Sequence, residues 1–312
     1  MKYCDFHCDA LNPEGALQVT GENLRRGGCL LQTFAAFISP LQDRFAFALS
    51  LCDKFDGLCE KEGYHPVRRF SDIEAGECNA LLAVEDGGAL EGSLDNLETL
   101  YERGVRLITL TWNRANELGY PAFPDYEGLL KGSVSFAARE KVRGLTPFGK
   151  EVVSRMGELG MLVDVSHGSD ALFSDVAEMS KIAGRPFVAS HSAAAEVHAC
   201  ARNLTDEQIR TLAGLGGAVG LYFCADFLGN DASAEGQRQA ILSHARHIVK
   251  VGGEDVLCFG SDFDGIPENA YIKNPAGMPA LMKELEREFG GRVAEKIASG
   301  NLLRVLKETL PS

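Results

Sequence analysis

The stretch LLAVE, residues 81–85, is a short apolar run that ends in a carboxylate. Four further apolar runs also end in side chains that can bind a metal ion. These side chains are His7 and Asp9 in FHCDA, His167 in MLVDVSH, His191 in FVASHS and Asp262 in VLCFGSD. Because the carboxyl ends of the strands of a parallel barrel all open into one mouth, we expect these residues and Glu85 to meet there.

The number of apolar runs and their residue pattern both match those of a parallel barrel. They are short, bounded by Gly, Pro or polar clusters, and mostly unbroken, as in parallel strands that are buried on both faces. About eight are recognisable, at residues 3–8, 29–37, 80–85, 105–112, 161–166, 187–191, 217–223 and 256–261. The pattern therefore predicts an α/β fold of the TIM-like (β/α)8 barrel class.

Helix signals lie between these runs. Thr146 and Pro147 are typical of the N-cap and first residue of a helix, here one that runs to Gly160. Thr205 and Gln208 form the pattern of a capping box. Further helices are expected near residues 234–251 and 291–309, with one more helical segment before the last.

Length and composition favour a single domain. The chain has 312 residues, of which 45% are hydrophobic, and this is enough for one large core. Residues 1–312 contain no Ser/Pro-rich linker and no internal repeat, so we expect one barrel domain. Two long insertions interrupt it, near residues 39–75 and 113–145. A long loop after a strand commonly shapes a binding site.

The net charge of −13 argues against nucleic acid and anionic membranes as partners. The nine cysteines contain no Cys-x-x-Cys pair, and several lie inside apolar runs, which indicates reduced, buried thiols. The N-terminus lacks the pattern of a secretory leader, and no apolar stretch is long enough to span a bilayer. We therefore expect a cytoplasmic protein.

The strand ends offer the ligands of a two-metal hydrolase. His7 and Asp9 are two residues apart, so both side chains point to the same face of a strand and can chelate one ion. Glu85 can bridge two cations with its two oxygens. The neighbouring Asp86 is the alternative bridge, but the position of Glu85 in its strand matches that of the other ligands.

His167 and His191 follow successive apolar runs, and each is preceded by a serine. A single histidine in such a place is more often a hydrogen-bonded core residue. Two of them, facing a third histidine and two acids, favour metal binding. We expect Ser166 and Ser192 to be hydrogen-bonding partners of the ligands, and neither to be a nucleophile, because no Gly-x-Ser-x-Gly motif is present.

The remaining candidates have weaker signals. Asp262 is nearer the strand end than Asp264, so we expect Asp262 to transfer protons and Asp264 to be structural. The planar guanidinium of Arg202 suits a substrate carboxylate, although a surface Arg beside a helix is an equally good interpretation. His244 and His247 lie on a helix that should be outside the barrel, away from its mouth.

Together these motifs resemble the membrane (renal) dipeptidase family of binuclear zinc dipeptidases, which has soluble bacterial members. The resemblance covers nearly the whole chain, through the segments HCD, AVEDGG, LTWN, DVSH, SHS, ARNLTDE and GSDFDG in this order. It implies a TIM-like barrel with two Zn²⁺ per chain. One zinc would be held by His7, Asp9 and Glu85, and the other by Glu85, His167 and His191.

The resemblance also implies an activity. Family members hydrolyse dipeptides, often with a D-residue at the C-terminal position, through a hydroxide shared by the two metals. Asp262 would handle the proton, Arg202 would bind the substrate carboxylate, and the enzyme would be a homodimer. Trp112 stands where many members have a histidine that contacts the substrate, and it can pack against a side chain but cannot accept a proton.

Two other interpretations remain. A different amidohydrolase would act on acyl-amino acids or lactones, but those relatives often begin with His-x-His and bridge their metals through a carboxylated lysine. This chain has His7-x-Asp9, and its 105–112 run ends without a lysine. A non-catalytic barrel that binds peptides would not need Asp262.

Overall fold

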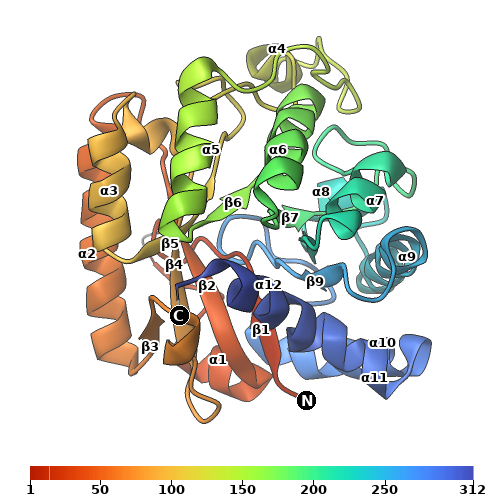
Figure 1. Cartoon of the computed structure of the whole chain (residues 1–312). Coiled ribbons are helices and arrows are strands. Elements are labelled where there is room, and N and C mark those ends of the chain that lie inside the picture. The colour runs from red at the N-terminus through yellow and green to blue at the C-terminus, as the bar shows by residue number, and fades with distance from the viewer. Residues whose placement is uncertain (14, 312) are drawn as a thin grey trace.

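The computed structural model describes residues 1–13 and 15–311, and its centre is the predicted barrel of eight parallel strands (Figure 1). The barrel strands are β1 (Tyr3–Asp5), β2 (Cys29–Phe37), β4 (Asn79–Glu85), β5 (Val105–Thr109), β6 (Leu162–Asp164), β7 (Val188–Ser192), β8 (Ala218–Leu221) and β9 (Leu257–Phe259). Pairing of β1 with β9 and of β2 with β4 closes the ring. The expected fold class is thereby confirmed.

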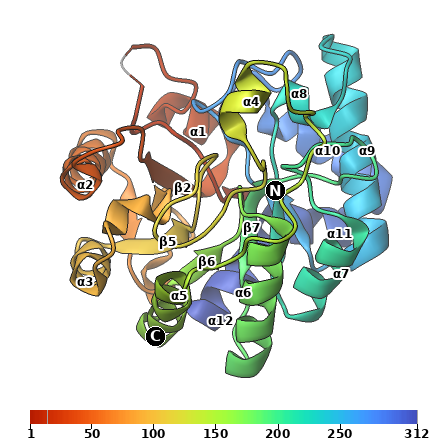
Figure 2. The same cartoon turned by 90° about the horizontal axis from the view of Figure 1, so that it is seen from above.

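Helices surround the strands, as the view from above shows (Figure 2). They are α1 (Gly21–Gly27), α2 (Arg44–Glu62), α3 (Leu94–Glu102), α4 (Tyr126–Leu130), α5 (Pro147–Leu159), α6 (Asp170–Ala183), α7 (Asp206–Gly214), α8 (Ala225–Leu228), α9 (Ala234–Gly252), α10 (Met278–Phe289), α11 (Gly291–Glu295) and α12 (Asn301–Thr309). Short 3₁₀ turns are η1 (Phe70–Asp72), η2 (Gly87–Leu90) and η3 (Pro275–Gly277).

The predicted helix caps are present. The Thr146 hydroxyl accepts the amide of Gly149 at the start of α5, and Thr205 and Gln208 form a complete capping box on α7. The last helix differs from the prediction near residues 291–309. A π-helical turn, η4 (Lys296–Gly300), separates α11 from α12, and an apolar sequence pattern does not distinguish such a turn from regular helix.

The two insertions lie on different sides of the barrel. Residues 39–75 form α2, which packs on β2 and β4, and a short strand β3 (His65–Val67) that the sequence did not predict. This strand has only three residues and contains Pro66, which is tolerated because β3 is at an edge. Residues 113–145 contain α4 and reach the strand ends, where the amide of Ala122 donates to the carbonyl of His167.

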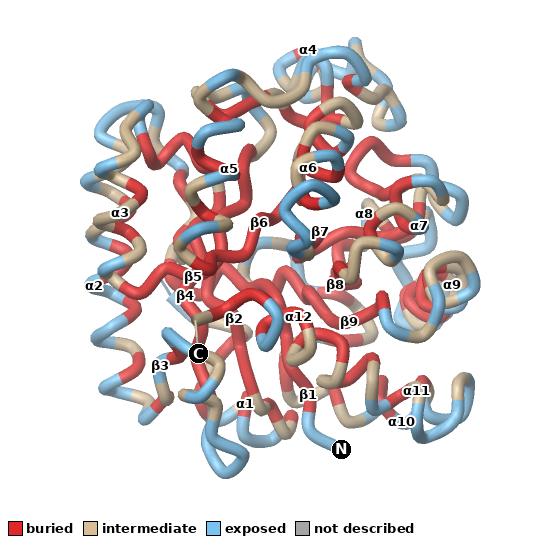
Figure 3. The backbone as a smooth tube through the Cα atoms, in the orientation of Figure 1, coloured by how far each residue is buried: buried red, intermediate tan, exposed pale blue. Residues whose placement is uncertain are grey.

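The core forms one layer inside the barrel and another between strands and helices. Leu302, Val305 and Leu306 of α12 pack on the inner layer near the amino ends of the strands, so α12 closes that end. Figure 3 shows the strands buried and the outer helix faces exposed. All nine cysteines are free, and none of the described helices is long and apolar enough to cross a membrane.

Two glycines allow β7, β8 and β9 to approach closely. A methyl group added at Gly220 or Gly260 would overlap the carbonyl oxygen of Ser190, which is backbone and cannot rotate away. Glycine is required at both positions for steric reasons, since neither has the positive φ that favours it elsewhere. This contact fixes the strand that carries His191.

We expect Gly260→Ala to lower the free energy of unfolding by about 1–3 kcal/mol, because the strands must separate to admit the methyl group. Urea denaturation measures the change. The control is Gly57→Ala in the exposed middle of α2, where nothing lies within 4 Å of the added methyl group. That variant should gain about 0.5–1 kcal/mol of stability. Equal stability of the two variants would contradict the packing argument.

Candidate metal centre

Six predicted side chains meet at the carboxyl ends of the barrel strands. His7 and Asp9 follow β1, Glu85 ends β4, His167 follows β6, His191 lies in β7 and Asp262 follows β9. All six are almost completely buried, and the most exposed of them, Asp262, has 8% of its surface accessible. The cluster is therefore at the end of the barrel opposite α12.

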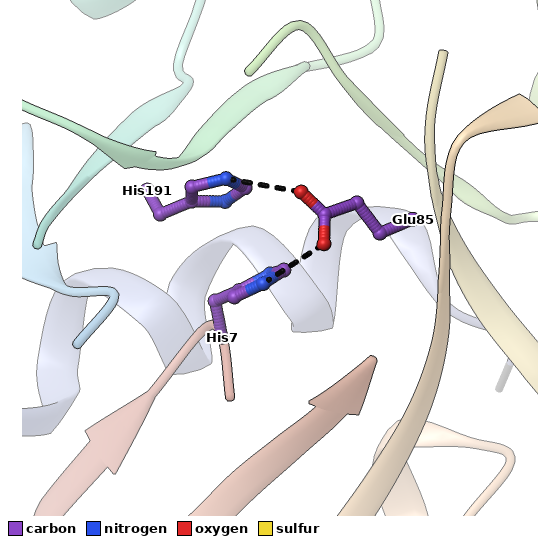
Figure 4. A group of neighbouring side chains, drawn as sticks. All are labelled: His7, Glu85 and His191. Atoms are coloured by element: carbon purple, nitrogen blue, oxygen red, sulfur yellow. Dashed lines mark ion pairs between the residues drawn. The ribbon is translucent and has the colours of Figure 1, made fainter. Parts of the chain in front are cut away.

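Glu85 is at the centre of this cluster, and its two oxygens face different partners. Its Oε2 is 3.5 Å from Nε2 of His7. Its Oε1 is 3.1 Å from Nε2 of His167 and 3.4 Å from Nε2 of His191. Figure 4 shows the carboxylate between His7 and His191. This is the arrangement that a carboxylate bridging two cations requires.

A second group of ligand atoms surrounds His7. Its Nε2 is 3.6 Å from Oδ2 of Asp9 and 3.7 Å from Oδ1 of Asp262. The ligand atoms of these three residues all lie within 4.8 Å of one another, as do those of His7, Glu85 and His191. The spacing leaves two adjacent places where an ion would have several ligands.

The tautomer of His167 leaves an acceptor facing the Glu85 carboxylate. Nδ1 of His167 is 2.8 Å from Oδ1 of Asn113, an oxygen that can only accept, so Nδ1 carries the proton. Its Nε2 then presents a lone pair to Oε1 of Glu85 and lies 2.9 Å from Nε2 of His191. Acceptors crowded together without protons are stabilised by a cation.

Buried atoms without partners support the same conclusion. Within the described residues, both ring nitrogens of His7 and Oδ1 of Asp9 have no hydrogen-bond partner. Leaving such atoms buried and unpaired costs free energy, so the fold provides for a ligand at this place. Imidazole nitrogens and carboxylate oxygens are the ligands of zinc and similar divalent ions. The residues present therefore fit two such ions.

Burial and nearby charges raise the pKa values of Asp9 and Asp262 but leave that of Glu85 low. Burial raises the pKa of Asp9 to about 6, and Glu85 adds to this by repulsion. Burial also raises the pKa of Asp262 well above its usual range; His7 opposes the shift, and Asp9 and Glu85 increase it. Burial would raise the pKa of Glu85 too, but the charge of His7 holds it well below normal. Glu85 is therefore ionised.

The two histidines beside Glu85 are held neutral. Burial, together with the positive charge of Arg202, lowers the pKa of His167 to about 3. Burial and the neighbouring His7 lower the pKa of His191 well below its usual value. A neutral imidazole is the form that binds a metal ion, so both rings are in the required state.

Two of the site residues have left-handed backbone. His167 has φ of 64° and Asp262 has φ of 65°, values that cost non-glycine residues about 1–3 kcal/mol. Both lie in the turns that come shortly after their strands, β6 and β9. Such strain is concentrated at functional sites, and the apolar pattern of the sequence does not reveal it.

The acidic neighbours of the site residues are bonded elsewhere. Asp86 accepts the amide of Gly88 at 2.9 Å and the side-chain amide of Asn116 at 2.5 Å, which caps η2. Asp264 accepts the backbone amides of Gln18 and Val19, at 2.6 and 3.0 Å, and anchors that loop. Neither carboxylate belongs to the cluster.

Arg202 and Trp112 lie beside the cluster. Arg202 is only 3% exposed, and its one described hydrogen bond from the guanidinium is a long one, 3.4 Å, to the carbonyl of His191. A buried guanidinium with so few partners is available to an anion. The half-buried ring of Trp112 lies 6.0 Å from that of His167, between Phe37 at 5.0 Å and Tyr126 at 5.4 Å.

The partners of the imidazole rings differ from the expected serines, and Ser166 contacts a ligand residue only through its backbone, where its hydroxyl accepts the amide of His191 at 3.1 Å. Ser192 does not contact a ligand side chain and instead donates to the carbonyl of Arg202. Ser190 contacts Nδ1 of His191 at 2.8 Å, and Asn113 contacts His167. The sequence contained both residues, next to His191 and Trp112, but nothing in their spacing showed which side chains face the rings.

The two histidines of α9 are apart from the cluster. His244 is buried, where its Nδ1 accepts the amide of Ala194 and its Nε2 contacts the carbonyl of Leu228. His247 contacts Asp206 at 2.6 Å on the outside of the barrel. Both side chains therefore bond to groups outside the metal cluster, as the sequence predicts.

Comparison with known proteins identifies the family of this chain. The chain matches the membrane dipeptidase family (peptidase family M19) over residues 5–310. An uncharacterized protein from the pqqA 5′ region of Klebsiella pneumoniae is 34% identical over 76% of this chain and 86% of its own length. Dipeptidase 3 of Mus musculus is 31% identical over 93% of this chain, which spans 58% of the mouse protein.

A solved structure has the same fold as this chain. The metallo peptidase from Rhodobacter sphaeroides liganded with a phosphinate mimic of the dipeptide L-Ala-D-Ala has a TM-score of 0.86 to this chain, over 99% of both chains, at 24% identity. This likeness shows the common fold. With the match over residues 5–310, it follows that the chain belongs to the membrane dipeptidase family, and the expected enzyme class, a metallo-dipeptidase, is confirmed.

Proposed function

We propose that the protein hydrolyses the peptide bond of dipeptides with two zinc ions bound at the strand ends. The observation that carries this proposal is the position of Glu85, with one oxygen toward His7 and the other toward His167 and His191. One ion is assigned to His7, Asp9 and Glu85. The second is assigned to Glu85, His167 and His191.

Bound divalent ions supply two kinds of chemistry here: they lower the pKa of a water molecule and they polarise the scissile carbonyl. The chain itself supplies the proton transfer. Asp262 is beside His7, and burial together with the nearby acids raises the pKa of its carboxyl, which makes the ionised carboxylate a stronger base. In our assignment it takes the proton of the attacking water and returns it to the leaving amine.

Arg202 binds the free carboxylate of the substrate in this proposal. Its buried guanidinium is close enough to His167 to lower that residue's pKa, and within the described residues its Nε has no partner. If the C-terminal carboxylate is held at a fixed place, the bond next to the C-terminal residue is the one that reaches the metal ions. This favours dipeptides over longer chains. Because the Rhodobacter sphaeroides relative holds an L-Ala-D-Ala mimic, we propose that L-Xaa-D-Xaa and L-Xaa-L-Xaa dipeptides are both substrates.

Trp112 is proposed to contact a substrate side chain. It forms an aromatic wall with Phe37 and Tyr126 beside His167, and a wall of this kind stabilises apolar groups. The nine free cysteines support a reducing compartment, which we propose to be the cytoplasm. The homodimer implied by the family resemblance stays a prediction.

Removal of the ions should lower both activity and stability. A chelator is expected to abolish dipeptide hydrolysis and to reduce the unfolding temperature, because an ion that binds only the native state adds about 2.7 kcal/mol of stability at 100 times its Kd. Differential scanning calorimetry with and without added zinc measures the shift. Glu85→Gln should lose the zinc-dependent shift, and the matched control Asp86→Asn should keep it. A zinc-dependent shift of wild-type size in Glu85→Gln would contradict the bridging role.

Asp262→Asn should lower kcat by about 10²–10⁴-fold, the usual contribution of a positioned acid or base. Zinc content, measured by atomic absorption, should stay at the wild-type level. Asp264→Asn is the matched control, because it changes a neighbouring carboxylate whose hydrogen bonds, among the described residues, are to the loop amides. Near wild-type kcat in Asp262→Asn, with zinc bound, would remove the proton-transfer assignment.

Arg202→Met should remove discrimination for the substrate carboxylate. We expect wild-type kcat/KM for a dipeptide to exceed that for its C-terminal amide by about 10–100-fold, since hydrogen bonds to charged groups contribute about 1.5–3 kcal/mol. In the variant the two substrates should be hydrolysed with similar kcat/KM. If the variant still prefers the free carboxylate as strongly as wild type, another residue binds that group.

A further inference from the structure

A fully buried carboxylate lies directly beneath the histidine side of the cluster. Asp164, the last residue of β6, accepts five hydrogen bonds, from Thr109 of β5, from Ser166 just after β6 and from Ser190 of β7. The Thr109 hydroxyl donates to Oδ2 at 2.6 Å. Ser166 donates to Oδ1 through its amide at 2.9 Å and its hydroxyl at 2.8 Å. Ser190 donates through its amide to Oδ1 at 2.8 Å and through its hydroxyl to Oδ2 at 2.6 Å.

The Ser190 hydroxyl connects this carboxylate to a metal-binding ring. Its oxygen lies 2.8 Å from Nδ1 of His191 as well as 2.6 Å from Asp164. A hydroxyl has a single proton, and an ionised carboxylate can only accept. The Ser190 proton therefore points to Asp164, and the contact with His191 is donated by the Nδ1–H of the ring. This leaves the lone pair of His191 on Nε2, which faces Glu85.

We propose that Asp164, acting through the Ser190 hydroxyl, is a positioning residue that holds His191 in the tautomer able to bind the metal ion shared with Glu85 and His167. The proposal rests on the two-metal function above and adds to it the residues that prepare one of the two ion sites. Hydrogen bonds from a metal-binding histidine to an outer acceptor fix its ring and increase its basicity. Here the acceptor is a serine held by a carboxylate.

The other side of the cluster contains a similar carboxylate without this connection. Asp5, also fully buried, accepts the amide of Ser261 at 2.8 Å, its hydroxyl at 2.5 Å and the amide of His7 at 3.3 Å. The Ser261 hydroxyl also lies 3.1 Å from the backbone carbonyl of His7, not from its ring. Among the described residues Nδ1 of His7 has no partner. The relay is therefore specific to the His191 side.

The test is zinc release from the loaded protein to a chromogenic chelator, followed separately for the two ions. Ser190→Ala should accelerate release of one ion by about 10–100-fold, the usual effect of losing an outer-shell partner, and leave the other unchanged. Asp9→Asn weakens the other ion site, so the phase that it accelerates belongs to the ion held by His7, Asp9 and Glu85. Thr109→Val is the matched control, because it removes a hydroxyl that donates to the same carboxylate at 2.6 Å and that has no other described hydrogen bond.

Asp164→Asn provides a second variant in case Ser190→Ala does not fold. Its amide can donate to the Ser190 oxygen, which turns the hydroxyl proton toward Nδ1 and favours the wrong tautomer of His191. We expect the same ion to be released faster, whereas Asp5→Asn should lower the unfolding temperature without accelerating that phase.

The outcomes separate the two proposals. If folded Ser190→Ala or Asp164→Asn releases both ions at wild-type rates, the relay is wrong and the two-metal function is unaffected. The relay is also overturned if Thr109→Val accelerates the same phase as strongly as Ser190→Ala. If the wild-type protein cannot be loaded with two zinc ions, the proposed function fails, and the relay with it.

Discussion

The structure depends on a buried carboxylate, Glu85, that faces three imidazole nitrogens at 3.1–3.5 Å. Such a carboxylate in a protein interior is costly unless it is paired with positive charge. The histidines pair with it incompletely, because His167 and His191 are held neutral and His7 also faces Asp9 and Asp262. Divalent cations would resolve this conflict, and this is the physical basis of the metal centre that we propose at this position.

The barrel tolerates this unfavourable cluster because its hydrophobic core, away from the cluster, provides the stability of the fold. At one end, the apolar face of α12 packs on the inner layer of side chains. At the other end, the strand termini can then carry polar groups, because the burial that stabilises the fold is already provided. Close packing of β8 and β9 against Ser190 fixes the backbone that presents His191. The fold and the site are thus divided between the two ends of the barrel, and the site can vary without loss of the core.

Much of this could be predicted from the sequence, for physical reasons. Parallel strands buried on both faces appear as short apolar runs, so the sequence predicts all eight barrel strands. Most of the runs extend beyond the strands, as 3–8 does beyond β1 and 256–261 beyond β9. β3 was missed because a three-residue edge strand leaves no pattern. The Asp164–Ser190–His191 relay was also missed. Asp164 and Ser190 were visible in MLVDVSH and FVASHS, but hydrogen-bond direction and left-handed turns depend on tertiary geometry.

The central claim is that two ions are bound on either side of the Glu85 carboxylate. Anomalous X-ray diffraction from zinc-loaded crystals, recorded above and below the zinc absorption edge, tests it most directly. The account predicts two zinc peaks per chain, one next to His7 and Asp9 and the other next to His167 and His191. A single peak, or peaks remote from Glu85, would contradict it.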